Sequence, residues 1–357
     1  MSTDADLVAE AVGELLRDRC PQEVVAAAEH TGRAPRLWAA LAEGGFPWVS
    51  VPEQAGGVGG SVAEACAVLE QVGHHAAPVP LAETGLLGGW LLARAGLPVP
   101  ARHPVSTARG AVVLRRDGSG WSVSGTVTRV PWARQAARIV LLAQTCEGPA
   151  VVSVDPAATR IVPGVNLAGE PRDTVHLDDV RIDADDVSAA PPDVDAEALL
   201  RRGALSRAAL IAGAAGRVLD LTLAYTRDRV QFGRPVARFP AVGAHLVRLA
   251  EHTEAARMAA RAAALVVDAD TPGSFVAVAA AKAVASEAAG LVAAHAHQAT
   301  GAMGMTREYE LGRLTRRLWS WREEYGGERV WNTRLGAFLA DAGADALWPT
   351  VAGGVVA

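Results

Sequence analysis

The stretch AYTRDRVQFGRPVARFPAVGAHLVRLA, residues 224–250, joins two long segments whose apolar residues recur every three or four positions. That spacing is typical of amphipathic helices. Between the two segments, Arg229, Gln231, Phe232 and Gly233 place a guanidinium, an amide, a ring and a flexible backbone at one corner. Arginine grips phosphate oxygens through paired hydrogen bonds, and an aromatic ring can lie along a base or ribose. The corner suits a nucleotide diphosphate, although a plain turn between helices also fits.

Two further stretches rich in glycine stand out. In QATGAMGMTREYELGRLTRR, residues 298–317, Gln298, Gly301 and Gly304 precede a new helical pattern. In GGFPWVSVPEQAGGVGGS, residues 44–61, the glycines form neither a complete GxGxxG nor a loop ending in GK[ST], so a phosphate-binding loop is disfavoured. A loop between two helices, with Ser61 capping the second, is the better interpretation.

The pattern along the chain predicts an α+β protein with three segments. Helical periodicity covers the first hundred residues, and short runs rich in Val and Ile follow, bounded by turn signals. After PPDVDAE the chain returns to long apolar helices. We therefore expect an N-terminal helical domain at 1–98, a small β domain at 99–192 and a C-terminal four-helix bundle at 193–357. The bundle is apolar on several faces, which favours packing against another subunit.

Composition excludes several classes of function. The net charge is −5 and no long run of Lys or Arg occurs in the 357 residues, so we expect no nucleic-acid partner. The acidic N-terminus does not look like a signal peptide, which predicts a cytoplasmic protein. The apolar run at 274–296 contains Lys282 and Glu287, which favours a buried helix over a membrane span.

The three cysteines are widely spaced and predict neither a disulfide framework nor a metal site. The pairs His74/His75 and His295/His297 have no Cys or carboxylate at a ligand-like spacing. We expect no metal, and we interpret these histidines as helix-surface or interface residues.

Taken together and in their order along the chain, the three glycine-containing stretches resemble motifs of the acyl-CoA dehydrogenases. The resemblance covers nearly the whole chain. RVQFGRPVARFPAV matches R-x-x-F-G-x-x-[IL]-x-x-[FY]-Q-x-[VI], QATGAMGMTREYEL matches Q-x-x-G-G-x-G-[FY]-x-x-E, and GGFPWVSVPEQAGGVGGS matches G-x-x-x-x-x-x-P-E-x-x-G-G-x-G. The predicted order of helical, β and helical segments is also that family's plan. The resemblance implies an FAD enzyme in which a glutamate removes the α proton of an acyl-CoA thioester and flavin N5 takes the β hydride.

The base position departs from the family. Its glutamate stands 27 residues after the glutamine of the second motif, and counting from Gln298 leads to Tyr325. A phenol, with an ordinary pKa of about 10, is a poor acceptor at neutral pH. Glu324 is adjacent and is the alternative candidate. Other members place the base on the first long C-terminal helix, where LLRRGALSRAAL, residues 199–210, has no acid.

The flavin contacts also depart from the family. The loop T-E-P-x-x-G-S-D has no counterpart in residues 96–120, a stretch that also looks shortened. Arg129 stands where the family has the aromatic residue over the flavin, and Pro131 where it has the threonine beside N5. The retained residues are those that, by the resemblance, reach the ADP half of a neighbouring subunit's FAD: Arg229, Gln231, Phe232, Gly233, Gln298, Gly301 and Gly304.

This asymmetry leads to a hypothesis with two alternatives. The chain is predicted to be the non-catalytic subunit of a heteromeric acyl-CoA dehydrogenase, completing the FAD site of a homologous partner that carries the glutamate. An acyl-CoA substrate and an electron-transfer acceptor are further expected partners. The first alternative is a self-sufficient homo-oligomer with Glu324 as base. The second is an interaction protein that binds neither FAD nor CoA, because a fold alone does not guarantee chemistry.

Overall fold

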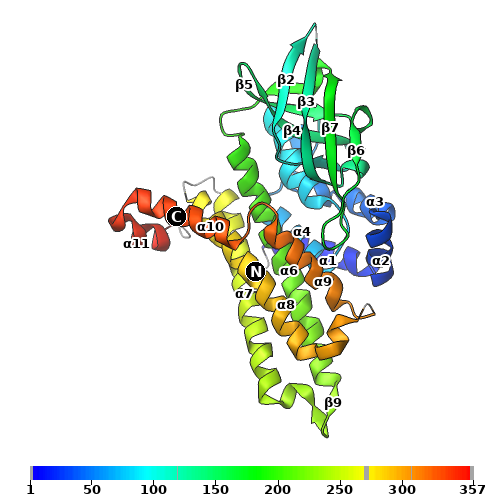
Figure 1. Ribbon diagram of the computed structural model, residues 1–357, viewed down its shortest axis with the longest axis vertical. Helices are drawn as coiled ribbons and strands as arrows, with labels where there is room; N and C mark the ends of the chain where they lie inside the picture. The colour runs from blue at the N-terminus through cyan, green and yellow to red at the C-terminus, as the bar shows by residue number, and fades with distance from the viewer. Residues whose placement is uncertain (1–2, 119, 269–272, 307, 354–357) are drawn as a thin grey trace. The chain divides into compact units, whose positions relative to one another are not determined.

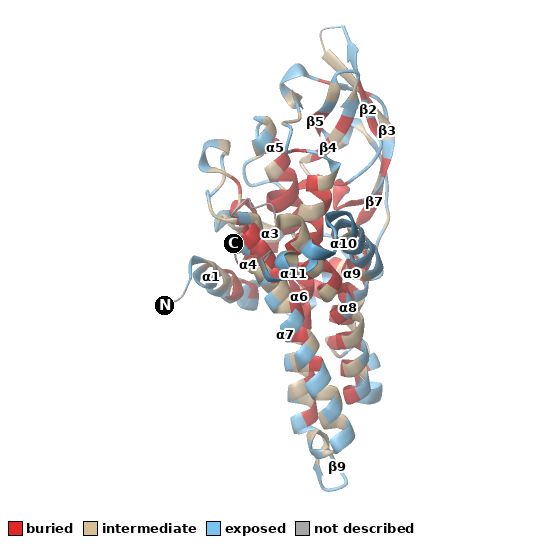
Figure 2. Ribbon diagram, turned by 90° about the vertical axis from the view of Figure 1, so that its left-hand side faces the viewer, coloured by how far each residue is buried: buried red, intermediate tan, exposed pale blue. Residues whose placement is uncertain are grey.

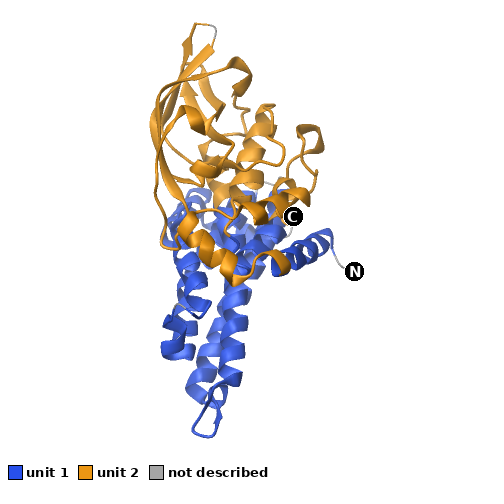
Figure 3. Cartoon of the chain, turned by 90° about the vertical axis from the view of Figure 1, so that its right-hand side faces the viewer, with its two compact units in different colours: residues 1–17, 66–77, 204–357 blue, residues 18–65, 78–203 orange. Residues whose placement is uncertain are grey.

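The structure is a computed structural model and describes residues 3–118, 120–268, 273–306 and 308–353 (Figure 1). Helices come first, strands follow, and helices return, which confirms the predicted α+β class. The N-terminal helices are α1 (Asp4–Arg19), α2 (Gln22–Thr31), α3 (Pro35–Glu43), α4 (Val62–His74), the π-helical segment η3 (Ala82–Gly89) and α5 (Trp90–Ala95). The chain forms two compact units, 1–17 with 66–77 and 204–357, and 18–65 with 78–203 (Figure 3). The three predicted segment boundaries stay a prediction.

The second unit contains an eight-stranded sheet. Its strands are β1 (Val105–Thr107), β2 (Val112–Asp117), β3 (Gly120–Pro131), β4 (Arg138–Thr145), β5 (Gly148–Val154), β6 (Arg160–Val162), β7 (Arg172–Ile182) and β8 (Val187–Ala189). They run in the order β6-β7-β3-β2-β4-β5-β8, with β1 parallel to β4. The sheet contributes to a Val-rich core, and the register of β3 against β7 shifts twice. These shifts mark β-bulges, which re-aim side chains locally.

The glycine-rich loop at 44–61 connects helices, as predicted. Ser61 Oγ accepts a hydrogen bond from the backbone N–H of Glu64 at 3.0 Å, and the Glu64 carboxylate accepts one from the Ser61 N–H at 2.7 Å. This reciprocal pair is a capping box, which satisfies two donors at the start of α4. The loop therefore leads into α4, and its last residue caps that helix.

The first unit combines parts of α1 and α4 with three long helices, α6 (Ala196–Asp228), which contributes residues from 204 onward, α7 (Pro240–Asp268) and α8 (Ser274–Thr300). The shorter helices α9 (Leu311–Glu323), α10 (Glu328–Ala342) and α11 (Ala344–Gly353) complete it. α8 packs against α7, α9 and α10. α4 and α6 cross at two glycines. A Cβ added at Gly213 would lie 1.7 Å from the Glu70 carbonyl oxygen, and one added at Gly73 would lie 2.1 Å from that of Leu210. Only glycine permits this approach of two backbones.

Two helical segments are long and apolar enough to cross a membrane by length and composition, Ala196–Asp228 and Ser274–Met305. Their most apolar windows are 61% and 67% buried within the structure (Figure 2). Lys282 lies in the second segment and is fully buried among alanines. This burial is the pattern of core helices, in line with the sequence-based interpretation of residues 274–296.

Candidate functional site

The first predicted nucleotide-binding segment is a tight hairpin between α6 and α7, made by β9 (Val230–Gln231) and β10 (Arg234–Pro235). Phe232 and Gly233 form its two-residue loop, with φ of 52° and 79°. Positive φ at both positions is the signature of a type I′ turn, which glycine adopts freely and an aromatic residue rarely does. Phe232 is 93% exposed, and Arg229 and Gln231 are also exposed. We call residues 229–235 the hairpin corner.

The second predicted segment closes α8. Gln298 lies exposed in the last turn of that helix, and Gly301 caps it with φ 60° and ψ −143°. Gly304 lies in the short 3₁₀ helix η8 (Gly301–Met305), where an added Cβ would lie 2.2 Å from Thr300 Oγ1. The segment thus leads into α9 through a turn in which Gly301 has a positive φ and a side chain at position 304 would clash with Thr300.

The fold brings these two segments to one end of the bundle. His245 Nδ1, near the start of α7, lies 3.0 Å from His295 Nδ1, near the end of α8. The two helices pack together, so they run antiparallel. Beyond η8, the Tyr309 hydroxyl donates to the Leu221 carbonyl near the end of α6 at 2.9 Å. The hairpin corner and residues 298–304 therefore share one end, which we call the nucleotide end.

The second region is the segment between α9 and α10, residues 324–327, which we call the base segment. The Glu324 carboxylate accepts a hydrogen bond from Arg207 Nε of α6 at 2.6 Å. The Arg207 side chain is 1% exposed and that of Glu324 is 9% exposed. Tyr325 has φ 57°, and the Arg207 guanidinium carbon lies 5.2 Å from the centre of its ring. Both candidate base residues therefore contact the same buried guanidinium.

Beneath the base segment lies Lys282, the single lysine of the chain. Its Nζ donates hydrogen bonds to Ser286 Oγ at 2.8 Å and to the carbonyl of Arg322 at 2.7 Å, with the Trp321 carbonyl at 3.4 Å. These carbonyls end α9, where the backbone lacks helical donors. Burial lowers the pKa of Lys282 from 10.5 to about 7, while the nearby Glu324 carboxylate opposes the shift.

This arrangement limits what Glu324 can do chemically. A general base needs a free lone pair within hydrogen-bond reach of the proton that it removes. Glu324 would have to break a charge-assisted contact with a buried guanidinium, and such a contact is roughly twice as strong as a neutral hydrogen bond. Leaving Arg207 buried without its partner would cost about 3–5 kcal/mol. The geometry therefore holds Glu324 as a structural counter-ion.

The β sheet offers a poor seat for a flavin ring. Arg129 lies exposed at the second bulge of β3 with φ 59°, and Pro131 is buried opposite Arg172 of β7. Residues 108–111 connect β1 to β2, in the stretch where the sequence has no counterpart of the loop T-E-P-x-x-G-S-D. The nucleotide end, by contrast, combines exposed donors with glycines at 233 and 301 that leave open space. The residues present thus fit the nucleotide half of FAD and not its redox ring.

Two residues of the base segment's surroundings were missed by sequence reasoning. Arg207 lies within residues 199–210, a stretch in which the sequence offers no acid and nothing local marks the arginine. Lys282 indicated only a buried helix. Lys282 could have been noticed because it is the single lysine in a chain with 33 arginines. A lone lysine in an apolar helix indicates a specific set of hydrogen-bond acceptors around it.

The histidine pairs do not assemble a metal site. His295 contacts His245, and its ring stacks with that of His252 at 6.3 Å between centroids. Burial first, and then His245, lower the pKa of His295. Within the described ranges, no group of three His, Cys, Asp or Glu side chains is placed to hold a metal ion.

Comparison with known proteins gives one consistent family. Residues 2–98 match the acyl-CoA dehydrogenase N-terminal domain and residues 194–329 match the acyl-CoA dehydrogenase C-terminal domain. The acyl-CoA dehydrogenase IpdE2 of Mycolicibacterium smegmatis is 31% identical over 316 residues, covering 87% of this chain and 91% of the relative.

Solved structures give the same family. The ChsE4-ChsE5 complex from Mycobacterium tuberculosis has a TM-score of 0.87 at 27% identity, covering 95% of this chain and 98% of that chain. A variant of the Tcur3481-Tcur3483 steroid ACAD has a TM-score of 0.86 at 25% identity, covering 96% and 99%. The chain therefore belongs to the acyl-CoA dehydrogenase family.

Proposed function

We propose that this chain is the non-catalytic subunit of a heteromeric, FAD-dependent acyl-CoA dehydrogenase. In this assembly it completes the FAD site of a homologous partner, which supplies the catalytic glutamate. The ChsE4-ChsE5 and Tcur3481-Tcur3483 structures each carry two different subunit names, which supports pairing of unlike chains. The acyl group, the electron acceptor and a location in the cytoplasm stay predictions of the family resemblance and the sequence.

The nucleotide end is the part of this chain that would hold FAD. When bound, FAD supplies the acceptor for the hydride that leaves the β carbon of the acyl-CoA. Arg229 and Gln231 offer a guanidinium and an amide to phosphate oxygens, and exposed Phe232 offers a ring face to the adenosine. Gln298 and the open backbone at Gly301 complete the surface. These side chains bind and orient, and none of them is a proton acceptor.

The observation that carries the proposal is the ion pair between Glu324 and Arg207. The acid nearest to the base position is committed to a buried cation, and the base position itself is Tyr325. A subunit built in this way keeps its fold through the base segment and leaves proton removal to its partner. The competing proposal, Glu324 as base in a self-sufficient homo-oligomer, requires that this pair open in every turnover.

The test is dehydrogenation of acyl-CoA thioesters with a dye as electron acceptor. The chain is assayed alone and after co-expression with the acyl-CoA dehydrogenase subunit encoded nearest to it. We expect turnover only from the complex, and a Glu324→Gln complex of unchanged FAD content should stay within a few-fold of wild type. A loss of about a hundredfold, the scale of a missing general base, would establish Glu324 as the base. Failure of every preparation to bind FAD and acyl-CoA would favour the interaction protein.

A further inference from the structure

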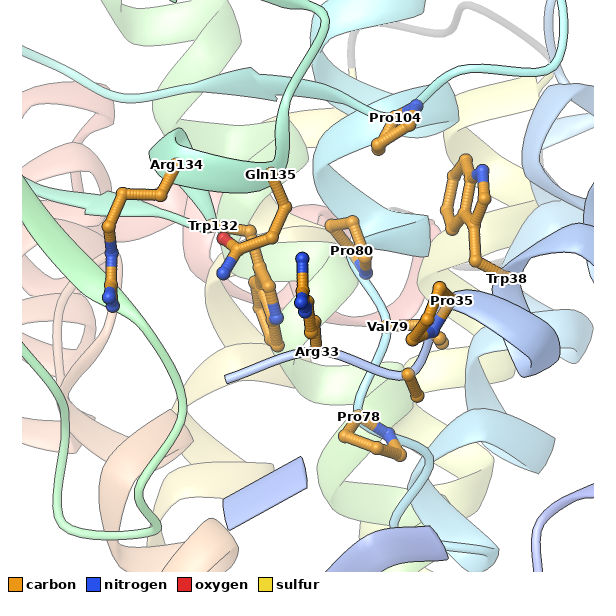
Figure 4. Close-up of a pocket in the computed structure, with 11 residues that line it drawn as sticks. Arg33, Pro35, Trp38, Pro78, Val79, Pro80, Pro104, Trp132, Arg134 and Gln135 are labelled. Atoms are coloured by element: carbon orange, nitrogen blue, oxygen red, sulfur yellow. The ribbon is translucent and has the colours of Figure 1, made fainter. Parts of the chain in front are cut away.

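A second candidate site lies in the unit formed by residues 18–65 and 78–203. It is a cavity of about 360 Å³, at the lower end of the range for small-molecule sites. Its walls come from the start of α3, the segment before η3, the residue before β1 and the turn after β3. The lining residues are Arg33, Ala34, Pro35, Trp38, Pro78, Val79, Pro80, Pro104, Trp132, Arg134 and Gln135 (Figure 4).

The walls are flat and apolar. Four prolines and the indoles of Trp38 and Trp132 line the space. The Trp38 indole N–H donates to the Arg102 carbonyl at 3.0 Å, which fixes the orientation of its ring. Trp132 is buried and has φ 48°, a conformation that a bulky residue adopts only under local strain. Such strain concentrates at functional sites, and here it places an indole beside the cavity.

The charge of the cavity is positive. Arg134 donates from Nε to both oxygens of buried Asp173, at 3.0 and 3.1 Å, so this guanidinium is already neutralised. Arg33 is exposed, and within the described part of the chain it forms no ion pair. Figure 4 shows its side chain pointing toward the same space as Trp132 and Gln135. The Arg33 guanidinium is therefore the group at this cavity that can bind an anionic ligand.

Gln135 adds a hydrogen-bond acceptor. Its Nε2 donates to the Gly32 carbonyl at 3.2 Å, which orients the amide. Its Oε1 is buried and accepts no hydrogen bond from the part of the chain that the structure describes. A buried acceptor left unsatisfied costs about 1–3 kcal/mol. The cavity therefore suits a ligand with a donor, such as a hydroxyl, on the same flat body as its negative charge.

We propose that this cavity binds a small aromatic monocarboxylate, with the carboxylate on Arg33, the ring against Trp38 and the prolines, and a ring hydroxyl donating to Gln135 Oε1. The site is separate from the nucleotide end and the base segment in the residues that form it. It therefore stands or falls independently of the proposed role in FAD binding.

The experiment is a binding titration of the whole chain, followed by ligand-observed NMR. The probes are 3-hydroxybenzoate, benzoate and neutral benzamide. We expect 3-hydroxybenzoate to bind with the lowest Kd, benzoate more weakly, and benzamide at least about tenfold more weakly than benzoate, because a charge-assisted hydrogen bond is lost.

Variants assign the site. Arg33→Gln should raise the Kd of both carboxylates about tenfold or more. Arg36→Gln, at an exposed arginine in the first turn of α3 that does not line the cavity, should leave the Kd unchanged. Gln135→Leu should remove the preference for the hydroxyl, and thermal melting confirms that each variant is folded. Equal effects of the two arginine variants, or no saturable binding of 3-hydroxybenzoate to the wild-type chain, would overturn the proposal.

Discussion

The nucleotide end and the base segment lie in the same helical bundle and are built in opposite ways. At the nucleotide end, Arg229, Gln231 and Phe232 are exposed, and Gly301 leaves its surroundings open. In the base segment, Arg207 and Glu324 are buried against each other. The polar side chains of the nucleotide end are exposed to solvent. Those of the base segment and its surroundings are buried and pair with each other.

This contrast indicates where a chain of this family can lose function without losing its fold. An acid that serves as a base must sit in a space left for substrate, and such a space contributes little to stability. Here the space near the base position contains a buried ion pair above a buried lysine, and such groups are tolerated only when each is paired or hydrogen-bonded. The nucleotide end contributes little to the core, because Arg229, Gln231 and Phe232 are exposed.

The largest expected effect comes from breaking the ion pair of the base segment. Arg207→Met leaves the Glu324 carboxylate buried without its main partner, which should lower the free energy of unfolding by about 3–5 kcal/mol. Chemical denaturation followed by circular dichroism measures the change. Arg248→Met is the matched control, because Arg248 pairs with Glu251 on an exposed helix face and should lose less than about 1 kcal/mol.

A double variant sharpens this prediction. Replacing both partners, Arg207→Met with Glu324→Leu, removes both buried charges and should recover most of the stability lost in the single variant. If Arg207→Met alone costs less than the Arg248 control, Glu324 is not held as a counter-ion, and the contrast between the two regions fails.

The next effect is a pH dependence from Lys282. Its pKa is about 7 in the folded protein and 10.5 in the reference state, so between these values the unfolded chain binds a proton that the folded chain does not. Stability should therefore rise as pH increases from about 7 towards 10.5, by a few kcal/mol. Below pH 7 the lysine is charged in both states and adds no further slope.

Because the chain has one lysine, this pKa can be measured directly. Lysine labelled with ¹³C at Cε gives one side-chain resonance, whose shift against pH reports the titration of Lys282. Lys282→Met should abolish the rise in stability between pH 7 and 10. A titration midpoint near 10.5 would show that the amine lies in water and that the base segment is not packed as described.

The smallest effect on the fold, and a clear effect on binding, is expected at the nucleotide end. Arg229→Ala should change the free energy of unfolding by no more than about 0.5 kcal/mol, because the side chain is exposed. In the complex it should weaken FAD retention about tenfold or more. Arg238→Ala, an exposed arginine beyond the hairpin corner, is the control. Equal FAD retention in both variants would remove the hairpin corner from the FAD site.

Sequence patterns predicted the fold well because its determinants are local. Val- and Ile-rich runs became β2, β3, β4, β5 and β7, and Ser61 caps α4 with Glu64 as its spacing suggested. The turn between α6 and α7 was expected from Gly233, although the hairpin geometry with Phe232 at positive φ was not. The type of a turn depends on backbone angles that several residue types can adopt, so the amino-acid sequence alone did not determine the turn type here.

The base segment was less predictable because its partners are distant in sequence. Counting from Gln298 located Tyr325 and Glu324, yet the contact with Arg207 spans 117 residues. No local rule connects a guanidinium in one helix with a carboxylate after another. Lys282 is likewise 40 residues away from the Arg322 carbonyl, at the end of α9, that accepts its hydrogen bond. Such pairs are decided by helix packing, which periodicity predicts only as a buried face.

We propose that this chain supplies contacts to the nucleotide half of a partner's FAD and does not hold a flavin of its own. The most direct measurement is bound FAD per chain, by absorbance of the released flavin, in protein purified alone and in complex with its homologous partner. We expect far less than one FAD per chain for the isolated protein and full occupancy of the partner's site in the complex. Arg229→Ala should reduce the occupancy in the complex. One FAD per isolated chain, together with acyl-CoA dehydrogenation by that protein, would contradict this proposal.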